Sequence, residues 1–260
     1  MMDDGSGGVI RVDICFDPDF DLLLSPSLRR RVVRKHVGHS TTMKDLVESC
    51  GVPHTEIGTL VLNGDASASF STRISDGDHL EVHPVLPASE GGSPLQPLAG
   101  PQVGFVVDIH LGRAARCLRL LGFDTICFIG HDDRELLDIM DTEGRILLTR
   151  DRRLLMNRRV RFGCCIRSAR YFDQVRQVVR RFGLAGRARS FSRCLACNGM
   201  LEDRPKEAVN ALLPEKTRRY YEEFRACPSC GRVYWRGAHA RRLQAFVDAV
   251  LREEGGHSVL

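Results

Sequence analysis

The 260-residue sequence has few of the features of membrane or secreted proteins, such as long hydrophobic runs. No apolar run approaches the roughly 20 residues that a membrane-spanning helix needs. The first residues, MMDDGSGG, are acidic and have neither the basic nor the apolar region of a signal peptide. We therefore expect a cytoplasmic protein with no membrane partner. In that compartment cysteines are more often metal ligands or buried thiols than disulfides.

The sequence also lacks glycine-rich phosphate loops and has little lysine. Neither GxGxxG nor GxxxxGK followed by Ser or Thr occurs, which argues against dinucleotide or P-loop chemistry. Between Arg145 and Arg193 there are fifteen arginines, no lysine and two acids, Asp151 and Asp173. Genome composition is one explanation for the arginines, but it does not explain the missing acids. We therefore expect a positive field that attracts polyphosphate and contacts nucleic acid; a solvated arginine-rich surface is the alternative.

Four of the ten cysteines form two CxxC pairs near the C-terminus, in RCLACNG and ACPSCG. Each pair lets two thiolates from one tight turn reach the same metal, and Asn198-Gly199 and Gly231 follow where the backbone must curl under the ion. The pattern predicts a tetrahedral Zn²⁺ site with the ligands Cys194, Cys197, Cys227 and Cys230. The stretch between the pairs is longer than usual, so an insertion is expected there. Two disulfides are the alternative.

Residues 1–86 are expected to form a small β-grasp domain. Thr41 or Thr42 can cap its helix, whose apolar face is Met43, Leu46 and Val47, and Gly51 ends it. The expected elements are strands at 9–16, 30–37, 58–65 and 76–85 and a helix within 41–52.

This segment resembles the ubiquitin-like sulfur-carrier proteins in VLNGD and DGDHLEVHPV. Carriers of that family end in Gly-Gly, whereas here Gly91-Gly92 lies inside a Pro/Gly/Ser linker at 87–102 and no cleavage signal follows. A carrier role is therefore disfavoured. We expect the domain to bind a protein partner or to pack on its neighbour.

Residues 103–190 alternate strand and helix, which predicts a parallel sheet with helices on its faces. The expected strands lie in 104–108, 124–130, 145–151 and 163–168, and the expected helices in 112–123, 132–144, 152–159 and 171–184. Ala115, Leu118 and Leu121 are apolar positions of the first helix. Gly144 ends the second helix, which Asp132 or Asp133 caps.

Acidic residues follow three successive strands of this expected sheet. Asp108 ends the first strand, Asp132 and Asp133 follow the second, and Asp151 ends the third. Ligands bind beyond the carboxyl ends of parallel strands, and gathered carboxylates need a cation. We expect Mg²⁺ or Mn²⁺ there, which activates water for phosphodiester cleavage. A helix cap is the alternative role for any one of these aspartates.

The segments FVVDIHLGRAARCLRLLGFDT, DDRELL and GRILLTRDRRLL resemble the RNase domain named after the C-terminal part of the Mut-seven exonuclease. The later RCLACNGML and CPSCGRVYWRGAH resemble the zinc ribbon that accompanies it, here at 191–260 with a C-terminal helix. The resemblance implies a PIN-like fold and metal-dependent RNA cleavage. It places the family's acidic positions on Asp108, Asp133 and Asp151.

Several arginines are candidates for contact with the RNA backbone. Arg113, Arg116 and Arg119 share the helix after Asp108; we choose Arg116 as the phosphate contact, and a surface position is the alternative for Arg119. The other candidates are Arg150, Arg152 and Arg153.

PIN nucleases commonly use a fourth acid. Glu135 and Asp173 are the candidates, and neither is assigned.

Near the second CxxC pair, Tyr234 and Trp235 lie beside Arg236 and His239. They either stack on bases or belong to a ribbon strand that packs on the nuclease domain, and the second interpretation is favoured. His239 is not assigned to the metal, because four cysteines already fill the zinc shell.

The overall prediction is an α/β protein that acts as a metal-dependent endoribonuclease. It has a PIN-like domain at 103–190, a β-grasp domain before it and a zinc ribbon after it. A non-catalytic zinc-ribbon RNA-binding protein and a sulfur-carrier-related fusion are the alternatives.

Overall fold

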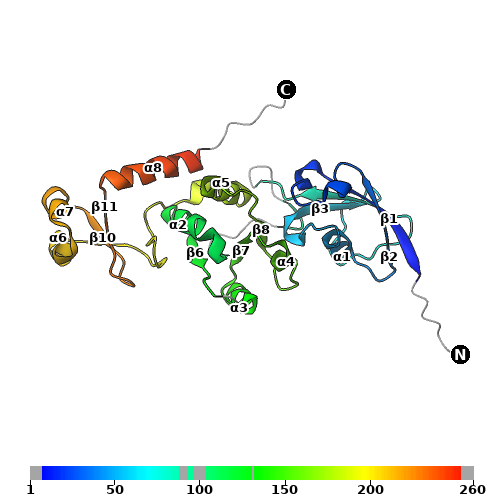
Figure 1. The fold of residues 1–260 in the computed structure, drawn as a ribbon, viewed down its shortest axis with the longest axis horizontal. Helices are drawn as coiled ribbons and strands as arrows, with labels where there is room; N and C mark the ends of the chain where they lie inside the picture. Colours follow the sequence, from blue (N-terminus) through cyan, green and yellow to red (C-terminus); the bar gives the residue numbers. More distant parts are fainter. Residues whose placement is uncertain (1–7, 88–92, 97–102, 131, 253–260) are drawn as a thin grey trace, which may run out of the picture. The chain divides into compact units, whose positions relative to one another are not determined.

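The computed structural model describes residues 8–87, 93–96, 103–130 and 132–252. The chain forms two compact units, Met1–Ala99 with Thr149–Arg167 and Gly100–Leu148 with Ser168–Leu260. Figure 1 shows the ribbon of each part. Gly91 and Gly92, considered above for a carrier role, lie outside the described residues.

The N-terminal sheet has the expected β-grasp order of elements. Its strands pair in the order β2-β1-β4-β3, with β1 antiparallel to β2 and parallel to β4. Alternate residues of β1 are buried, as one face of a sheet over a core requires. The elements are β1 (Val9–Phe16), β2 (Val32–Gly38), α1 (Met43–Glu48), β3 (Ile57–Leu62) and β4 (His79–Pro84), with short 3-10 turns η1 (Pro18–Phe20), η2 (Pro26–Leu28) and η3 (His54–Glu56).

Local chemistry explains where α1 begins. Thr42, and not Thr41, is the N-cap, since its side-chain oxygen accepts a hydrogen bond from the Asp45 N–H at 3.2 Å. The expected apolar residues Met43, Leu46 and Val47 are buried.

The second sheet is parallel and flanked by helices, as predicted. Its strand order is β6-β5-β7-β8, and β5 pairs in parallel with both β6 and β7. Asp132 is the N-cap of α3, and Gly144 ends that helix in the left-handed conformation at φ 62°. The elements are β5 (Gly104–Val107), η5 (Ile109–Leu111), α2 (Gly112–Leu120), β6 (Asp124–Cys127), α3 (Asp133–Glu143), β7 (Ile146–Thr149), α4 (Arg152–Leu155), β8 (Gly163–Cys165) and α5 (Tyr171–Arg181).

The C-terminal part is a three-stranded antiparallel ribbon with an insertion between the cysteine pairs. Val209, Leu213 and Phe224 form its small core, against which Trp235 packs. The ribbon strands are β9 (Glu202–Arg204), β10 (Phe224–Ala226) and β11 (Val233–Trp235); the insertion holds α6 (Lys206–Val209), η7 (Asn210–Leu212) and α7 (Glu215–Tyr220). After the short turn η6 (Ala185–Arg187) and the ribbon, the chain ends with α8 (Ala238–Leu251).

Aromatic contacts join α8 to α5. The Phe246 ring stacks on Tyr171 with centroids 5.8 Å apart and meets Phe172 edge-on at 5.7 Å. Within the described part of the chain, none of the helices combines the length and the apolar character that a membrane crossing demands.

Candidate functional site

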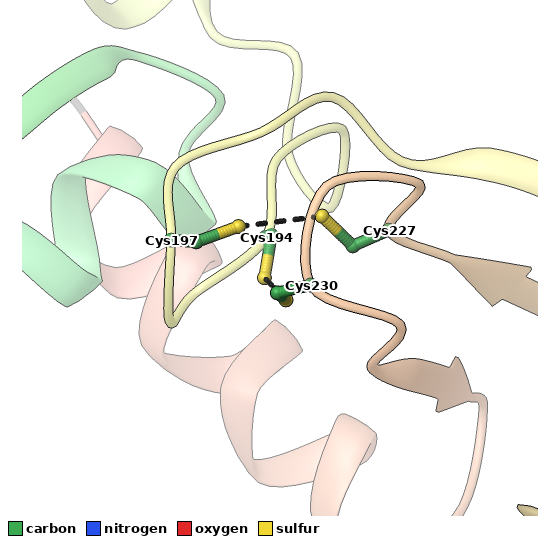
Figure 2. A group of neighbouring side chains, drawn as sticks. All are labelled: Cys194, Cys197, Cys227 and Cys230. Atoms are coloured by element: carbon green, nitrogen blue, oxygen red, sulfur yellow. Dashed lines mark hydrogen bonds between the residues drawn. The ribbon is translucent and has the colours of Figure 1, made fainter.

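The four predicted cysteine ligands come together in the structure. Figure 2 shows the two CxxC turns facing one another. The sulfur atoms of Cys194 and Cys230 lie 3.5 Å apart, and those of Cys197 and Cys227 lie 3.3 Å apart. All four sulfur atoms fall within 4.8 Å of one another. This donor set fits a tetrahedral Zn²⁺ ion.

The backbone of each turn adopts the shape that places two thiols on one side. Asn198 and Gly231 both have left-handed conformations, with φ 73° and 72°. In the first turn the Cys194 N–H donates to the Gly199 carbonyl at 2.7 Å, and the Asn198 N–H donates to the Cys194 carbonyl at 3.0 Å. The residues after each CxxC therefore have the role that the sequence predicted.

Tyr234 supports the first cysteine pair from β11. Its hydroxyl lies within hydrogen-bond distance of the Cys194 sulfur, at 3.1 Å, and accepts from the Leu195 N–H at 3.1 Å. Burial raises the pKa of Tyr234, and the neighbouring Cys194 raises it further. Burial also raises the pKa of Cys194, but donors including the Cys197 N–H and the Tyr234 hydroxyl outweigh it and lower the pKa to about 6. In the same cluster the Gly199 N–H lowers the pKa of Cys197, but burial and the neighbouring thiols outweigh it and raise the pKa to about 12.

Tyr234 therefore contacts the cysteine site, whereas the sequence suggested base stacking or packing on the nuclease domain. Trp235, its neighbour on β11, packs on the ribbon's own core.

Arg119 connects the first cysteine turn to the α/β part of the same unit. It is only 7% exposed, so a surface position on the helix is wrong. Its Nε donates to the Thr125 carbonyl at 2.8 Å. Its Nη1 donates to the carbonyls of Leu195 at 3.2 Å and Ala196 at 2.8 Å, the two residues between the cysteines. One guanidinium thus satisfies backbone groups of β6 and of the turn together.

Asp124 forms a second connection that the sequence did not reveal. Its carboxylate accepts from Arg145 at 2.6 Å and from the Asn198 side chain at 2.8 Å, and pairs with Arg193 at 3.4 Å. The side-chain amide oxygen of Asn198, Oδ1, in turn accepts from the Thr125 N–H at 3.0 Å. Burial raises the pKa of Asp124, but the hydrogen bonds from Arg145 and Asn198 outweigh it and hold the pKa below its usual value.

The three predicted catalytic aspartates all lie at helix N-termini. Asp108 accepts from the His110 N–H at 2.9 Å, and Asp151 accepts from the N–H groups of Arg153 at 2.7 Å and Leu154 at 3.2 Å. Asp133 is the first residue of α3 and is exposed, whereas Asp132 accepts from the Arg134 N–H. Asp108 and Asp151 therefore also have the capping role that was the alternative, whereas Asp132 has it in place of Asp133.

A joint metal site of these aspartates remains a prediction, because Asp108 and Asp133 belong to one unit and Asp151 to the other. Among the described residues, the four cysteines form a group of potential ligands close enough to share an ion. Of the fourth-acid candidates, Glu135 is exposed on α3, and Asp173 pairs with Arg170 at 3.8 Å.

The predicted RNA-contacting arginines are exposed, but they differ in their contacts. Arg116 lies on α2, Arg150 follows β7, and Arg153 lies on α4. Arg152 also donates a hydrogen bond from Nη1 to the Leu23 carbonyl of the β-grasp domain. Arg152 thus has a structural contact that its sequence context did not indicate.

Comparison with protein families agrees with this architecture. The family model described as the Mut7-C RNAse domain matches residues 103–247, and the one described as Mut7-C ubiquitin matches residues 9–90. No curated protein and no solved structure matches the chain.

Proposed function

The chain belongs to the Mut7-C RNAse domain family, whose model covers more than half of its length, and from this premise we propose that it is a metal-dependent endoribonuclease. The family match identifies a nuclease-type domain that follows a ubiquitin-like domain. The single observation that carries the proposal is this match over 103–247, which includes all three predicted catalytic aspartates.

The proposed active residues are Asp108, Asp133 and Asp151. In support, β5 and β7 run parallel, with Val107 opposite Leu148, so both strands end at the same edge of the sheet. Asp108 follows β5 directly and Asp151 follows β7 by two residues. Carboxylate oxygens suit Mg²⁺ or Mn²⁺, which when bound lowers the pKa of water and stabilises the leaving oxygen.

The chain's own residues have separate roles in this proposal. The aspartates hold and orient the ion, while Arg116 or Arg150 contacts the scissile phosphate. Arg153 contributes to RNA attraction through its charge. The cysteine site holds structural Zn²⁺ and takes no part in the chemistry.

Replacing the aspartates by asparagine tests the reaction. Asn caps a helix as well as Asp, so Asp108→Asn and Asp151→Asn should fold normally. Each removes one negative ligand, and we expect the rate of RNA cleavage to fall about 100-fold or more. Cleavage is measured on mixed RNA with Mg²⁺, Mn²⁺ or EDTA, and circular dichroism checks the fold.

Asp132→Asn is the matched control for Asp133→Asn, because the two residues are neighbours and only Asp133 is proposed to bind the metal. Asp132→Asn should retain the wild-type rate. Cleavage that persists in Asp108→Asn, in Asp151→Asn and in EDTA contradicts the mechanism. If the wild type binds RNA but never cleaves it with either metal, the chain is a non-catalytic RNA-binding protein.

A further inference from the structure

The stretch 149–167 belongs to the same compact unit as the β-grasp domain. It contains Asp151, Arg150 and Arg153, three residues of the proposed nuclease site. Its polar contacts with the β-grasp domain include two buried hydrogen bonds, which involve His54 and Glu56.

Glu56 makes the central contact. This acid of η3 is 1% exposed. Its Oε1 accepts from the Cys165 N–H at 2.8 Å, and its Oε2 pairs with the Arg167 guanidinium at 3.2 Å. Cys165 is the last residue of β8, which lies at the end of the sheet order, so the carboxylate covers an edge strand. Acids are almost never this buried unless they are paired, and both Glu56 oxygens have partners here.

Three further contacts join the β-grasp domain to the segment 149–167. His54, 6% exposed, places Nε2 2.6 Å from the Val160 carbonyl; a carbonyl can only accept, so Nε2 is the donor of this hydrogen bond. Arg152 donates to the Leu23 carbonyl, and Arg167 donates to the Asp19 carbonyl at 3.2 Å. The contacts thus begin near Asp19 and continue through η3.

A chain of hydrogen bonds leads from Glu56 to Asp151. Glu56 accepts a hydrogen bond from the Cys165 N–H. The next residue, Ile166, donates its N–H to the Thr149 carbonyl at 2.8 Å. The Thr149 hydroxyl then accepts from the Asp151 N–H at 2.9 Å. Ile166 and Thr149 are both buried, so this path is shielded from water.

We propose that the β-grasp domain is a built-in support of the nuclease and that Glu56 is the positioning residue that holds β8 and, through Thr149, the Asp151 backbone. The inference rests on the proposed nuclease function for its catalytic consequence. It gives the ubiquitin-like domain an internal partner, the segment 149–167 of the same chain.

The test compares full-length Glu56→Gln with Glu81→Gln. Glu81 is an acid of β4 in the same domain whose side chain is 45% exposed, so its replacement is a matched control. Glu56→Asp is the second variant; it keeps the charge but shortens the reach by one methylene, and so it remains informative if Glu56→Gln does not fold. Hydrogen exchange followed by mass spectrometry reports on 149–167, and RNA cleavage is measured over a range of Mg²⁺ concentrations.

In Glu56→Gln and Glu56→Asp we expect amide exchange in 149–167 to accelerate about tenfold or more, with little change in 104–127. The kcat should fall about tenfold and half-saturation by Mg²⁺ should need more metal, while the KM for RNA changes little, because a displaced ligand affects chemistry more than binding. Glu81→Gln should match the wild type in every measurement.

The inference is overturned if folded Glu56 variants keep both the exchange in 149–167 and the Mg²⁺ dependence of the wild type. If in that case Asp151→Asn still abolishes cleavage, the nuclease function stands and only the positioning role is wrong. A wild type that leaves RNA intact with both metals overturns the proposed function, and the positioning role is overturned with it, whatever the exchange shows.

Discussion

At the scale of single residues, Arg119 shows how one buried cation can join two parts of a protein. Its guanidinium meets three backbone carbonyls, those of Thr125, Leu195 and Ala196. A lysine ammonium is a single point charge and cannot occupy the same three directions. The planar fork of arginine is therefore required at this position.

We expect Arg119→Lys to lower the free energy of unfolding by about 2–3 kcal/mol, because at least one buried carbonyl loses its donor. Urea denaturation followed by circular dichroism measures this. Arg116→Lys is the control, since Arg116 is exposed on the same helix, and it should change stability by less than about 0.5 kcal/mol. Equal stability of the two variants would show that Arg119 is not a connector.

The sequence predicted the residues whose role is local, and it did not predict those whose role depends on distant contacts. The two cysteines of each CxxC pair, and Thr42 with the Asp45 N–H that it caps, lie three positions apart, so their spacing in the sequence is informative. Glu56 and Cys165 are 109 positions apart, and nothing in PHTEIG marks the acid as buried. The role of Asp124 likewise depends on a distant contact, because its carboxylate accepts a hydrogen bond from the Asn198 side chain, 74 positions later.

At the scale of elements, the hydrophobic pattern and the helix caps predicted the helices and strands of both sheets. Some elements begin or end at other residues than expected, because the local backbone conformation differs there. The strand expected from residue 30 begins at Val32, because Arg30 is left-handed at φ 53°. The helix expected over 152–159 is only Arg152–Leu155. The chain turns after it, with the Asn157 N–H bound to the Leu154 carbonyl and the Val160 N–H bound to the Asn157 carbonyl.

The cysteine turns are the elements in which removal of the bound metal has the clearest expected consequence. Chelation of Zn²⁺ should unfold the ribbon, because ligand binding and local folding are coupled. Through Arg119 and Asn198, protection should also fall at Thr125 and its neighbours on β6, while the N-terminal sheet keeps its protection. Elemental analysis, hydrogen exchange and the fluorescence of Trp235, the sole tryptophan, measure these effects.

Trp235 emission should shift to longer wavelength on chelation and return when Zn²⁺, but not Mg²⁺, is restored. Natively purified protein that contains no zinc, or a chelated protein with unchanged exchange around Thr125, contradicts this prediction.

At the scale of the whole molecule, the net charge of +5 understates the positive character of the middle of the chain. Some of its arginines are committed to carboxylates: Arg145 and Arg193 pair with Asp124, and Arg167 pairs with Glu56. Five exposed arginines lie within the short stretch 149–167 that the β-grasp domain contacts: Arg150, Arg152, Arg153, Arg158 and Arg161. The arginines proposed to attract RNA and Asp151, one of the residues proposed to bind metal, therefore lie in one segment that contacts the β-grasp domain.

This arrangement predicts RNA binding that weakens steeply with salt, because each neutralised phosphate releases counterions. Arg153→Glu should lower RNA affinity and reduce the slope of log affinity against log salt by about 0.7–1, with stability unchanged within about 0.5 kcal/mol. Arg152→Glu should lower affinity and stability together, because Arg152 also bonds the Leu23 carbonyl. Fluorescence anisotropy of a labelled single-stranded RNA, read at several salt concentrations, and urea denaturation separate the two effects. Salt-independent binding, or an affinity that neither variant lowers, would show that these arginines are only a solvated surface. Equal stability of the two variants would contradict the structural role of the Arg152 contact.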